Sequence, residues 1–209
     1  RYVVLAPTGI AAVNVGGVTM HSFFRIPFKP LLPDDPEFAV SRLRSRLKYP
    51  KSLVKLIRNL ELIIIDEISM VRADIIDFMD KVLRVYSGNM REPFGGKQLL
   101  LVGDIFQLEP VVTADMRELL RKHYPNSYFF SARAFGEINI VSIDLKKVYR
   151  QSDNEFIGLL DRVRENRVSA QDLLKLNSRV LPASPDEEGT MAMTLATTRD
   201  KVDYINDKH

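Results

Sequence analysis

The sequence LIIIDE, residues 62–67, indicates most directly how this chain folds, because an unbroken apolar run ends abruptly in two adjacent carboxylates. Two further runs share this form: YVVLA at 2–6 is followed by Pro7-Thr8-Gly9, and LLLV at 99–102 is followed by Gly103-Asp104. Short runs so uniformly apolar, and so rich in Val, Ile and Leu, are typical of strands buried on both faces, and such strands belong to parallel sheets. We therefore predict a mostly parallel sheet that contains these three strands.

Helical periodicities accompany these strands. After Ser69, apolar residues recur at the spacing of one helix face, at Val71, Ile75, Met79, Val82, Leu83 and Tyr86. Ser152-x-x-Glu155 has the form of a capping box and predicts a helix whose inward face is made of Phe156, Ile157, Leu160 and Val163. Strands that alternate with helices favour an α/β domain with flanking helices, and its ligands bind outside the carboxyl ends of the strands. The polar residues that end the apolar runs are therefore the first functional candidates.

Several segments interrupt this alternation. Four prolines between Pro27 and Pro36 predict an extended loop, and between residues 42 and 58 there follow seven cations and no acid. Together they predict a small insertion at 25–60, between two strands of the sheet. Farther along the chain we predict a strand at 138–143, a linker at 181–186 and another strand at 191–196.

Composition excludes several classes of function. The 209 residues contain no Cys and three His, which rules out disulfides, redox cysteine pairs and thiolate zinc sites and disfavours a histidine-rich metal site. No apolar run approaches the roughly 18 residues of a membrane-spanning helix, and the first residues lack the pattern of a signal peptide. The net charge of +3 permits an anionic partner without requiring one. Because the sequence starts without Met and directly in a strand, we expect a piece of a longer, intracellular protein.

Asp66 and Glu67 are the sharpest candidates for catalysis. A strand that ends in two carboxylates delivers them to one edge of the sheet, pointing in different directions because side chains alternate. In nucleotide hydrolases the first such carboxylate holds Mg²⁺, usually through water, and the second polarises the attacking water. Alternatively, the pair is a plain strand end, followed by negative charge that is favourable at a helix N-terminus.

The segment GDIFQLEPV, residues 103–111, strengthens the catalytic interpretation. Another buried strand ends there in Gly103-Asp104, and Gln107 follows on a loop stiffened by Pro110. The amide of Gln107 can donate to a phosphate oxygen and accept from a water, so it can sense a terminal phosphate. The alternative is an ordinary Gly-Asp turn with a solvated glutamine.

The segment at 6–24 suits phosphates and bases. Thr8 and Gly9 follow a strand and open a helix, so they would present a hydroxyl and backbone N–H groups to a phosphate. Phe23 and Phe24 could stack on bases. Taken singly, each of these two rings fits the core of the protein better.

Two basic features allow both a functional and an ordinary interpretation. Arg150 lies between the predicted strand at 138–143 and the capped helix, where its guanidinium could reach a transferring phosphoryl group or form a surface salt bridge. The cations at 42–58 form either a solvated helical face or a contact with nucleic acid, and the lack of any acid among them favours nucleic acid.

Four motifs, in this order, resemble the Pif-type (petite integration frequency) helicases: APTGIAAVNVGGVTMHSFF at 6–24, IIIDEISM at 63–70, GDIFQLEPV at 103–111 and VYRQSDNEFIGLLDRVR at 148–164. The resemblance covers nearly the whole chain. It implies a RecA-like (P-loop NTPase) fold and a superfamily-one motor that uses ATP and Mg²⁺ to move 5′ to 3′ along single-stranded DNA. Forked or structured DNA is its implied substrate.

The resemblance also assigns roles by position. On the nucleotide it implies Asp66 for Mg²⁺, Glu67 as the base, and Gln107 and Arg150 on the γ-phosphate. Along the single strand it implies four residues: Thr8, Gly9, His21 and Phe23. The insertion at 25–60 falls where the family carries its small wedge subdomain, and 145–167 matches the family's own signature segment.

The same resemblance implies a division of the chain and a cellular setting. Residues 1–144 would form the first RecA-like domain without its P-loop unit, and 145–209 the linker, the signature helix and the start of the second RecA-like domain. We expect a monomeric motor with roles in DNA repair, recombination and telomere maintenance, located in the bacterial cytoplasm and nucleoid or in the eukaryotic nucleus or mitochondrion.

The chain departs from the family pattern in three respects. It contains no GxxxxGK[ST], since its one Gly-Lys pair, Gly96-Lys97, is followed by Gln98. The later helicase motifs are also absent, and Glu109 stands where the family usually has Pro. We therefore expect these 209 residues alone to bind ATP poorly and to hydrolyse hardly any. The alternatives are a DNA- or protein-binding module that never turns over ATP, and a RecD-like or conjugative-relaxase helicase.

Overall fold

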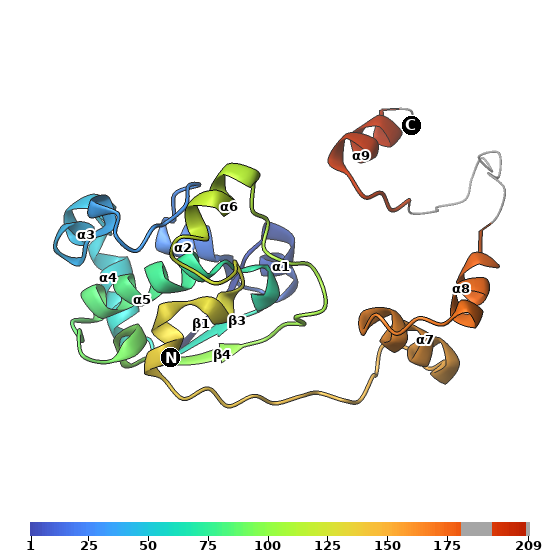
Figure 1. The fold of residues 1–209 in the computed structure, drawn as a ribbon. Helices are drawn as coiled ribbons and strands as arrows, with labels where there is room; N and C mark the ends of the chain where they lie inside the picture. The colour runs from blue at the N-terminus through green and yellow to red at the C-terminus, as the bar shows by residue number, and fades with distance from the viewer. Residues whose placement is uncertain (181–193, 208–209) are drawn as a thin grey trace. The chain divides into compact units, whose positions relative to one another are not determined.

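The computed structural model describes residues 1–180 and 194–207, which divide into two units, Arg1–Gln151 and Ser152–His209. The first unit is built on a parallel sheet of four strands in the order β2-β1-β3-β4 (Figure 1). Their bounds are β1 (Tyr2–Ala6), β2 (Val18–Thr19), β3 (Leu62–Ile65) and β4 (Gln98–Leu101). The predicted parallel α/β sheet is confirmed, and the three apolar runs form its strands β1, β3 and β4.

The register of the sheet brings all four strands to a common edge. Leu5 pairs with Ile65, and Ile65 pairs with Leu101, while Ala6 pairs with Thr19 at the far side of β1. β3 lies between β1 and β4, which explains why every residue of β3 is apolar and why Ile63 and Ile65 are fully buried. The residues that follow each strand therefore leave the sheet side by side.

Helices and short 3₁₀ turns complete the first unit. The helices are α1 (Gly9–Asn14), α2 (Met20–Phe24), α3 (Val40–Leu47), α4 (Lys51–Asn59), α5 (Ala73–Ser87) and α6 (Ala114–Leu120). The 3₁₀ turns are η1 (Pro36–Phe38), η2 (Ile68–Met70), η3 (Pro93–Gly96), η4 (Phe129–Ser131) and η5 (Arg133–Glu137). The helix predicted after Ser69 is confirmed as α5. All six predicted apolar positions are buried, although the first of them, Val71, lies before the helix begins.

Three buried aspartates of α5 anchor three separate loops to this helix. Asp74 accepts a hydrogen bond from the backbone N–H of Leu31 (2.9 Å), Asp77 from that of Ala134 (3.0 Å) and Asp80 from that of Phe94 (2.6 Å). Buried carboxylates are stable only when such donors surround them. α5 is therefore the element to which the loops around the sheet are tied.

The insertion at 25–60 consists of the predicted extended loop, η1 and the helix pair α3 and α4. The proline-rich segment has no helix or strand until Pro36 begins η1. Leu43, Leu47 and Ile57 turn inward and are buried, while the basic residues of both helices are exposed. The stretch 42–58, which is basic and contains no acid, therefore supplies the exposed faces of α3 and α4.

The strand predicted at 138–143 is wrong. Residues 139–149 have no regular structure, and apolar side chains such as Val141 (84% exposed) and Ile143 (79%) face solvent. A strand needs a neighbour to satisfy its backbone N–H and C=O groups, and none of the four described strands pairs with this segment. An apolar run alone was thus insufficient to make a strand here.

The second unit contains α7 (Asn154–Arg164), α8 (Ala170–Asn177) and α9 (Arg199–Asn206). The predicted helix is confirmed, but its cap and inward face are corrected. Asp153, not Ser152, caps α7 and accepts from the N–H groups of Glu155 (2.9 Å) and Phe156 (3.1 Å). A full capping box lies instead at Ser169 and Asp172, where α8 begins.

α7 turns a different face inward from the one predicted. Its only buried residue is Leu159, whereas the predicted Phe156, Leu160 and Val163 are each more than a third exposed. The cause is a bidentate pair between Arg162 and Asp172 at the start of α8, with N–O distances of 2.9 and 2.6 Å. Because Leu159 and Arg162 share one helix face, this pair turns that face toward α8.

The predicted linker at 181–186 lies outside the described residues. So do the first three residues of the strand predicted at 191–196, and its remaining residues, 194–196, are not in a strand. The predicted division at residue 144 falls within the irregular segment 139–151, and the identity of the parts on either side of it stays a prediction. None of the helices that the structure describes is long and apolar enough to cross a membrane.

Candidate functional site

The candidate site follows the carboxyl edge of the sheet, where four strands end in polar residues. In spatial order, His21 lies just beyond β2, Thr8 beyond β1, Asp66 and Glu67 beyond β3, and Asp104 beyond β4. For β1, β3 and β4 this arrangement is the one predicted for the ends of parallel strands, whereas β2, which brings His21 to the same edge, was not predicted. It divides the edge into a β3–β4 half, which carries the carboxylates, and a β1–β2 half, which carries the hydroxyl and the imidazole.

Backbone hydrogen bonds fix the β3–β4 half. The N–H of Asp66 donates to Leu5 (2.9 Å) on β1, and the N–H of Ile68 donates to Val102 (3.0 Å) beyond β4. Asp66 and Glu67 are both half-buried, and among the described residues neither carboxylate accepts a hydrogen bond or joins an ion pair. Two adjacent carboxylates without protein partners are therefore held at a rigid position.

Glu67 adopts a left-handed backbone conformation, with φ 52° and ψ 42°. Such a conformation is unfavourable for a residue with a side chain and is found preferentially where function requires it. Gly103 makes this turn possible from the other side, since a Cβ there would lie 3.0 Å from the backbone nitrogen of Ile68. The chain thus accepts local strain to set the direction of the Glu67 side chain.

Gln107 is held at the end of β4 by Asp104. Its backbone N–H donates to the carbonyl of Asp104 (3.1 Å), and its side-chain amide donates to the Asp104 carboxylate (3.3 Å). Gln107 is exposed, and Pro110 of the same loop is buried. Glu109, which departs from the family pattern, accepts a hydrogen bond from the hydroxyl of Tyr128 (3.3 Å) and so ties this loop to another part of the unit.

Arg150 is not brought to this half of the edge by any contact in the structure. It is exposed, lies in the irregular segment 139–151, and forms no hydrogen bond or ion pair with the described residues. The strand predicted at 138–143, which was expected to precede Arg150, is not formed. Its guanidinium is free, and its role stays a prediction.

The β3–β4 half fits the metal and phosphate end of a nucleotide. Mg²⁺ in phosphate sites usually takes one or two carboxylates together with phosphates and waters, rather than a complete protein cage. The partnerless oxygens of Asp66 and Glu67 suit that role, and within the described ranges no group of three or more His, Cys, Asp or Glu could hold a metal by itself. No GxxxxGK[ST] is present to cradle the remaining phosphates.

On the β1–β2 half, Thr8 caps α1. Its hydroxyl oxygen accepts a hydrogen bond from the N–H of Ala11 (3.2 Å), as expected for a helix N-cap. Gly9, the first residue of α1, is exposed, and a Cβ placed there would meet nothing within 4 Å. The backbone at this helix start is therefore open to a ligand.

A cavity of about 180 Å³ joins Thr8 to His21. It is lined by Pro7, Thr8, Met20, His21, Met70, Val71, Arg72, Ile75 and Val111. His21 is half-buried, and its pKa is lowered mainly by burial and further by the Arg72 guanidinium, while Asp74 partly opposes this shift. A neutral imidazole and mostly apolar walls suit a nucleotide base or sugar better than a phosphate.

Phe23 belongs to the core. Only 8% of it is exposed, and its ring packs edge-to-face against Phe24 with 4.9 Å between the centroids. Because so little of this ring is exposed, the structure favours its interpretation as a core residue, and the DNA contact of Phe23 stays a prediction. The exposed aromatic ring of this region is Phe28, which sequence analysis passed over because it lies in the proline-rich loop.

Arg72 and Asp74 are the other residues that sequence analysis missed. The Nε and Nη2 atoms of Arg72 donate to the two carboxylate oxygens of Asp74 at 2.8 and 2.9 Å, and the Asp74 side chain is fully buried. Nη2 also reaches the carbonyl of Lys29 at 3.5 Å. This ion pair supports the wall of the cavity, and its only sequence signal was an Arg-x-Asp at the start of α5.

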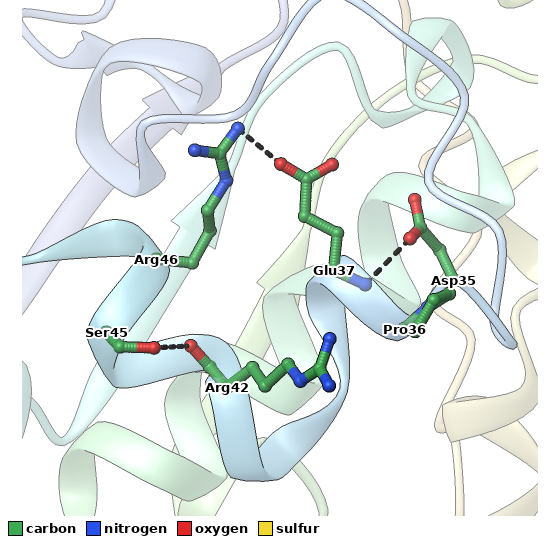
Figure 2. Close-up of a pocket in the computed structure, with 6 residues that line it drawn as sticks. All are labelled: Asp35, Pro36, Glu37, Arg42, Ser45 and Arg46. Atoms are coloured by element: carbon green, nitrogen blue, oxygen red, sulfur yellow. Dashed lines mark hydrogen bonds and ion pairs between the residues drawn. The ribbon is translucent and has the colours of Figure 1, made fainter.

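A second cavity, of about 370 Å³, lies between η1 and α3 and is lined by Asp35, Pro36, Glu37, Arg42, Ser45 and Arg46. Figure 2 shows Arg46 directed at the carboxylate of Glu37, and the hydroxyl of Ser45 bonded to the carbonyl of Arg42 (2.8 Å). Lys29 also pairs with Glu37 and Asp35. Two acids and two arginines line this cavity, so the lining carries no net charge.

The exposed face of α4 keeps its cations available. Lys51, Lys55 and Arg58 recur at i, i+4 and i+7 and so lie along one side of the helix. All three are exposed, and none pairs with an acid of the described chain. Arg58 donates weakly to the carbonyl of Tyr86 (3.4 Å). This side of α4 is a row of positive charge suited to a polyanion.

Comparisons with known proteins agree with this geometry. Residues 1–173 match the PIF1-like helicase family. The chain is 34% identical over 204 residues to the ATP-dependent DNA helicase PIF1 of Saccharomyces cerevisiae, covering 97% of this chain and 22% of that protein. It is 32% identical over 206 residues to human PIF1, covering 99% of this chain and 29% of that protein.

Solved helicase structures are similar over the whole chain. A structure of two coordinating Pif1 helicases, solved to explain DNA unwinding at forked duplexes, gives a TM-score of 0.88 at 40% identity. A Pif1 helicase from Bacteroides in complex with ADP-AlF3 and single-stranded DNA gives 0.85 at 39% identity. This chain is covered completely in both cases, and it covers 47% and 46% of those chains, or about half of their length. The chain belongs to the PIF1-like helicase family.

Proposed function

We propose that this chain is the central part of an ATP-dependent DNA helicase that moves 5′ to 3′ along single-stranded DNA. The observation that carries the proposal is the carboxyl edge of the sheet, which places the partnerless carboxylates of Asp66 and Glu67 beyond β3 and a cavity with an open helix start beyond β1 and β2. A motor needs this proximity, because hydrolysis at one site must alter the grip on DNA at another.

At the β3–β4 half, Asp66 would hold Mg²⁺ through water, and Glu67 would orient and polarise the attacking water. The metal, when bound, neutralises charge on the phosphate oxygens. Glu67 suits the role of base because its left-handed backbone and the lack of a protein partner leave its carboxylate free to accept a proton. Catalysis of phosphoryl transfer is largely positioning and charge stabilisation, which a rigid sheet edge supports.

Gln107 and Arg150 would couple the state of the nucleotide to the rest of the protein. Gln107 would donate its amide to the γ-phosphate, exchanging the weak hydrogen bond that it now makes to Asp104. Arg150 lies one residue before the boundary of the first unit, and its guanidinium has no described partner. A free guanidinium near a domain boundary can complete a nucleotide site when domains close.

At the β1–β2 half, Thr8, Gly9 and His21 would contact single-stranded DNA. The open backbone at Gly9 would meet a phosphate, while the cavity between Thr8 and His21 would take a sugar or base. The row of cations on α4 would meet the phosphates of forked or structured DNA. A monomeric motor, roles in repair, recombination and telomere maintenance, and an intracellular location stay predictions from family membership.

The test is single-strand-stimulated ATP hydrolysis by a longer form of the protein, extended at both ends. Glu67→Gln should lower turnover by about 10²–10⁴-fold, because the water loses its base, while ATP binding is kept. Glu109→Gln serves as a matched control outside the carboxylate pair. Unchanged turnover in Glu67→Gln contradicts the assigned role, and a salt titration of DNA binding counts the phosphate contacts.

A second function is favoured by one observation, the lack of a GxxxxGK[ST] motif in these residues. In this alternative the chain binds DNA or a protein and never turns over ATP. The extended protein distinguishes the two functions, because a binding module would show no ATP hydrolysis with or without DNA. The RecD-like alternative loses support, since the family match is to PIF1-like helicases over residues 1–173.

A further inference from the structure

Phe28 is an apolar side chain held almost entirely in solvent. It is 93% exposed, more than any other exposed large apolar side chain of the described residues. Its ring is nevertheless ordered against a neighbour, because it stacks on His21 with 5.2 Å between centroids and 9° between planes. A single exposed apolar side chain is common on protein surfaces. Phe28 differs because its ring is stacked on another ring beside the candidate site, and this arrangement suggests a function.

The loop that carries Phe28 is held on both sides of the ring. Before the ring, the N–H of Ile26 donates to the carbonyl of His21 (3.0 Å), and two further contacts follow the ring. The N–H of Leu31 donates to the buried carboxylate of Asp74 (2.9 Å), and Arg72 reaches the carbonyl of Lys29 (3.5 Å). Pro27, which precedes the ring, has a fixed φ angle. The ring is therefore presented by an anchored backbone, which lowers the entropy lost when a ligand binds it.

The ring also lies next to the cavity of the β1–β2 half. His21, its stacking partner, lines the same cavity as Thr8 and Arg72. We propose that Phe28 is a stacking platform for a base of single-stranded DNA, and that it extends the His21–Phe28 stack outward by one base. This inference rests on the proposed DNA binding and adds to it a residue that neither the motifs nor the family match assigns.

Single-stranded DNA fits this platform better than a duplex or a protein does. Unpaired bases expose their π-faces and stack on aromatic side chains whatever their sequence, whereas the bases of a duplex are already stacked on each other. The hydroxyl of Thr8 lies along the cavity where the adjoining sugar would run. An exposed ring beside a hydroxyl and a mostly apolar cavity matches the base and sugar of one nucleotide.

The first experiment measures binding of the 209-residue chain to fluorescein-labelled oligothymidylate and to an abasic strand of equal length. Phe28→Ala should raise the Kd for oligothymidylate about tenfold, because one stacked base is lost, and should leave the Kd for the abasic strand unchanged. Phe28→Tyr should restore binding, and Phe28→Leu should not. Since Phe28 is exposed, these variants should fold normally.

Phe130 provides a matched control. It is also exposed (49%), and it stacks on Tyr128 with nearly the same geometry, 5.2 Å between centroids and 6° between planes. Its stacking partner Tyr128, unlike His21, does not line the cavity. Phe130→Ala should therefore bind both strands as the wild type does. An equal loss in the two variants, or an equal effect of Phe28→Ala on the abasic strand, overturns the stacking role.

The second experiment exploits the absence of tryptophan from this chain. Phe28→Trp places the chain's single tryptophan at the platform, and we expect oligothymidylate, but not the abasic strand, to quench the tryptophan emission as a base stacks on it. Phe130→Trp should not be quenched. A Phe28→Trp protein that binds oligothymidylate with unaltered emission overturns this inference alone, whereas a wild-type chain that binds no oligothymidylate overturns the proposed DNA binding as well.

Discussion

The two halves of the carboxyl edge are built in opposite ways. On the β3–β4 half, two carboxylates stand half-buried without protein partners, and one of them sits on a strained backbone. On the β1–β2 half, the cavity is lined largely by apolar and neutral groups, and its one cation, Arg72, is neutralised by the fully buried Asp74. At one sheet edge, therefore, the charged groups of the β3–β4 half lack protein partners, whereas the charged group of the β1–β2 half has one.

Under the proposed function, this difference separates the residues for catalysis from the residues for DNA binding. Groups that must bind a metal or accept a proton cannot be neutralised by protein partners, so stability is lost where catalysis is proposed. Groups proposed only to bind single-stranded DNA can keep all their protein contacts, so these contacts stabilise the β1–β2 half. Substitutions in the two halves should thus change stability in opposite directions.

The largest effect on stability should come from the support of the β1–β2 half. Asp74→Ala leaves the Arg72 guanidinium without its counter-ion and the N–H of Leu31 without an acceptor. Breaking a buried pair from one side costs about 3–5 kcal/mol, and we expect that loss in the free energy of unfolding, measured by urea denaturation. Asp66→Ala is the matched control and should stay within about 0.5 kcal/mol of wild type, because its carboxylate has no partner to lose. Similar losses in the two variants contradict the comparison.

A smaller effect of opposite sign is expected at the strained residue of the β3–β4 half. Glu67→Gly should raise the free energy of unfolding by about 0.5–1 kcal/mol, because glycine adopts the left-handed conformation without steric cost. Asp66→Gly, at a neighbouring position that does not have a positive φ, should lower it by a similar amount. Thermal and urea denaturation of both variants check this, and a destabilised Glu67→Gly shows that the backbone is not strained.

Much of this edge could be predicted from the sequence because its signals are local. An apolar run that ends in carboxylates already predicts a buried parallel strand and places candidate residues at its carboxyl end, as for Ile63 and Asp66. The face of α5 was predictable for the same reason, since helical spacing and burial are encoded within fifteen residues.

The features that were missed or predicted wrongly depend on contacts between residues that are distant in the sequence. Phe28 is presented because Leu31, nearby on the same loop, bonds to Asp74, 43 residues along the chain, and no local pattern reveals that bond. Phe23 and Phe24 were ambiguous because two adjacent rings can be core or surface, depending on how α2 packs. The predicted strand before Arg150 failed because an apolar segment becomes a strand only when a neighbour satisfies its backbone.

The smallest effect should be a pH dependence that belongs to the β1–β2 half alone. The pKa of His21 is lowered from its usual 6.5, mainly by burial and then by Arg72, against the weaker effect of Asp74. The unfolded chain therefore takes up a proton at a higher pH than the folded chain does. The contribution of His21 to stability is complete above about pH 6.5 and is lost as the pH falls toward its lowered pKa.

The wild type should lose more stability than His21→Asn between pH 7 and pH 5, measured by urea denaturation at each pH. If the free energies of unfolding of the two proteins change in parallel with pH, burial of this imidazole does not oppose its protonation. The β1–β2 half would then accommodate a charged side chain as readily as the β3–β4 half does.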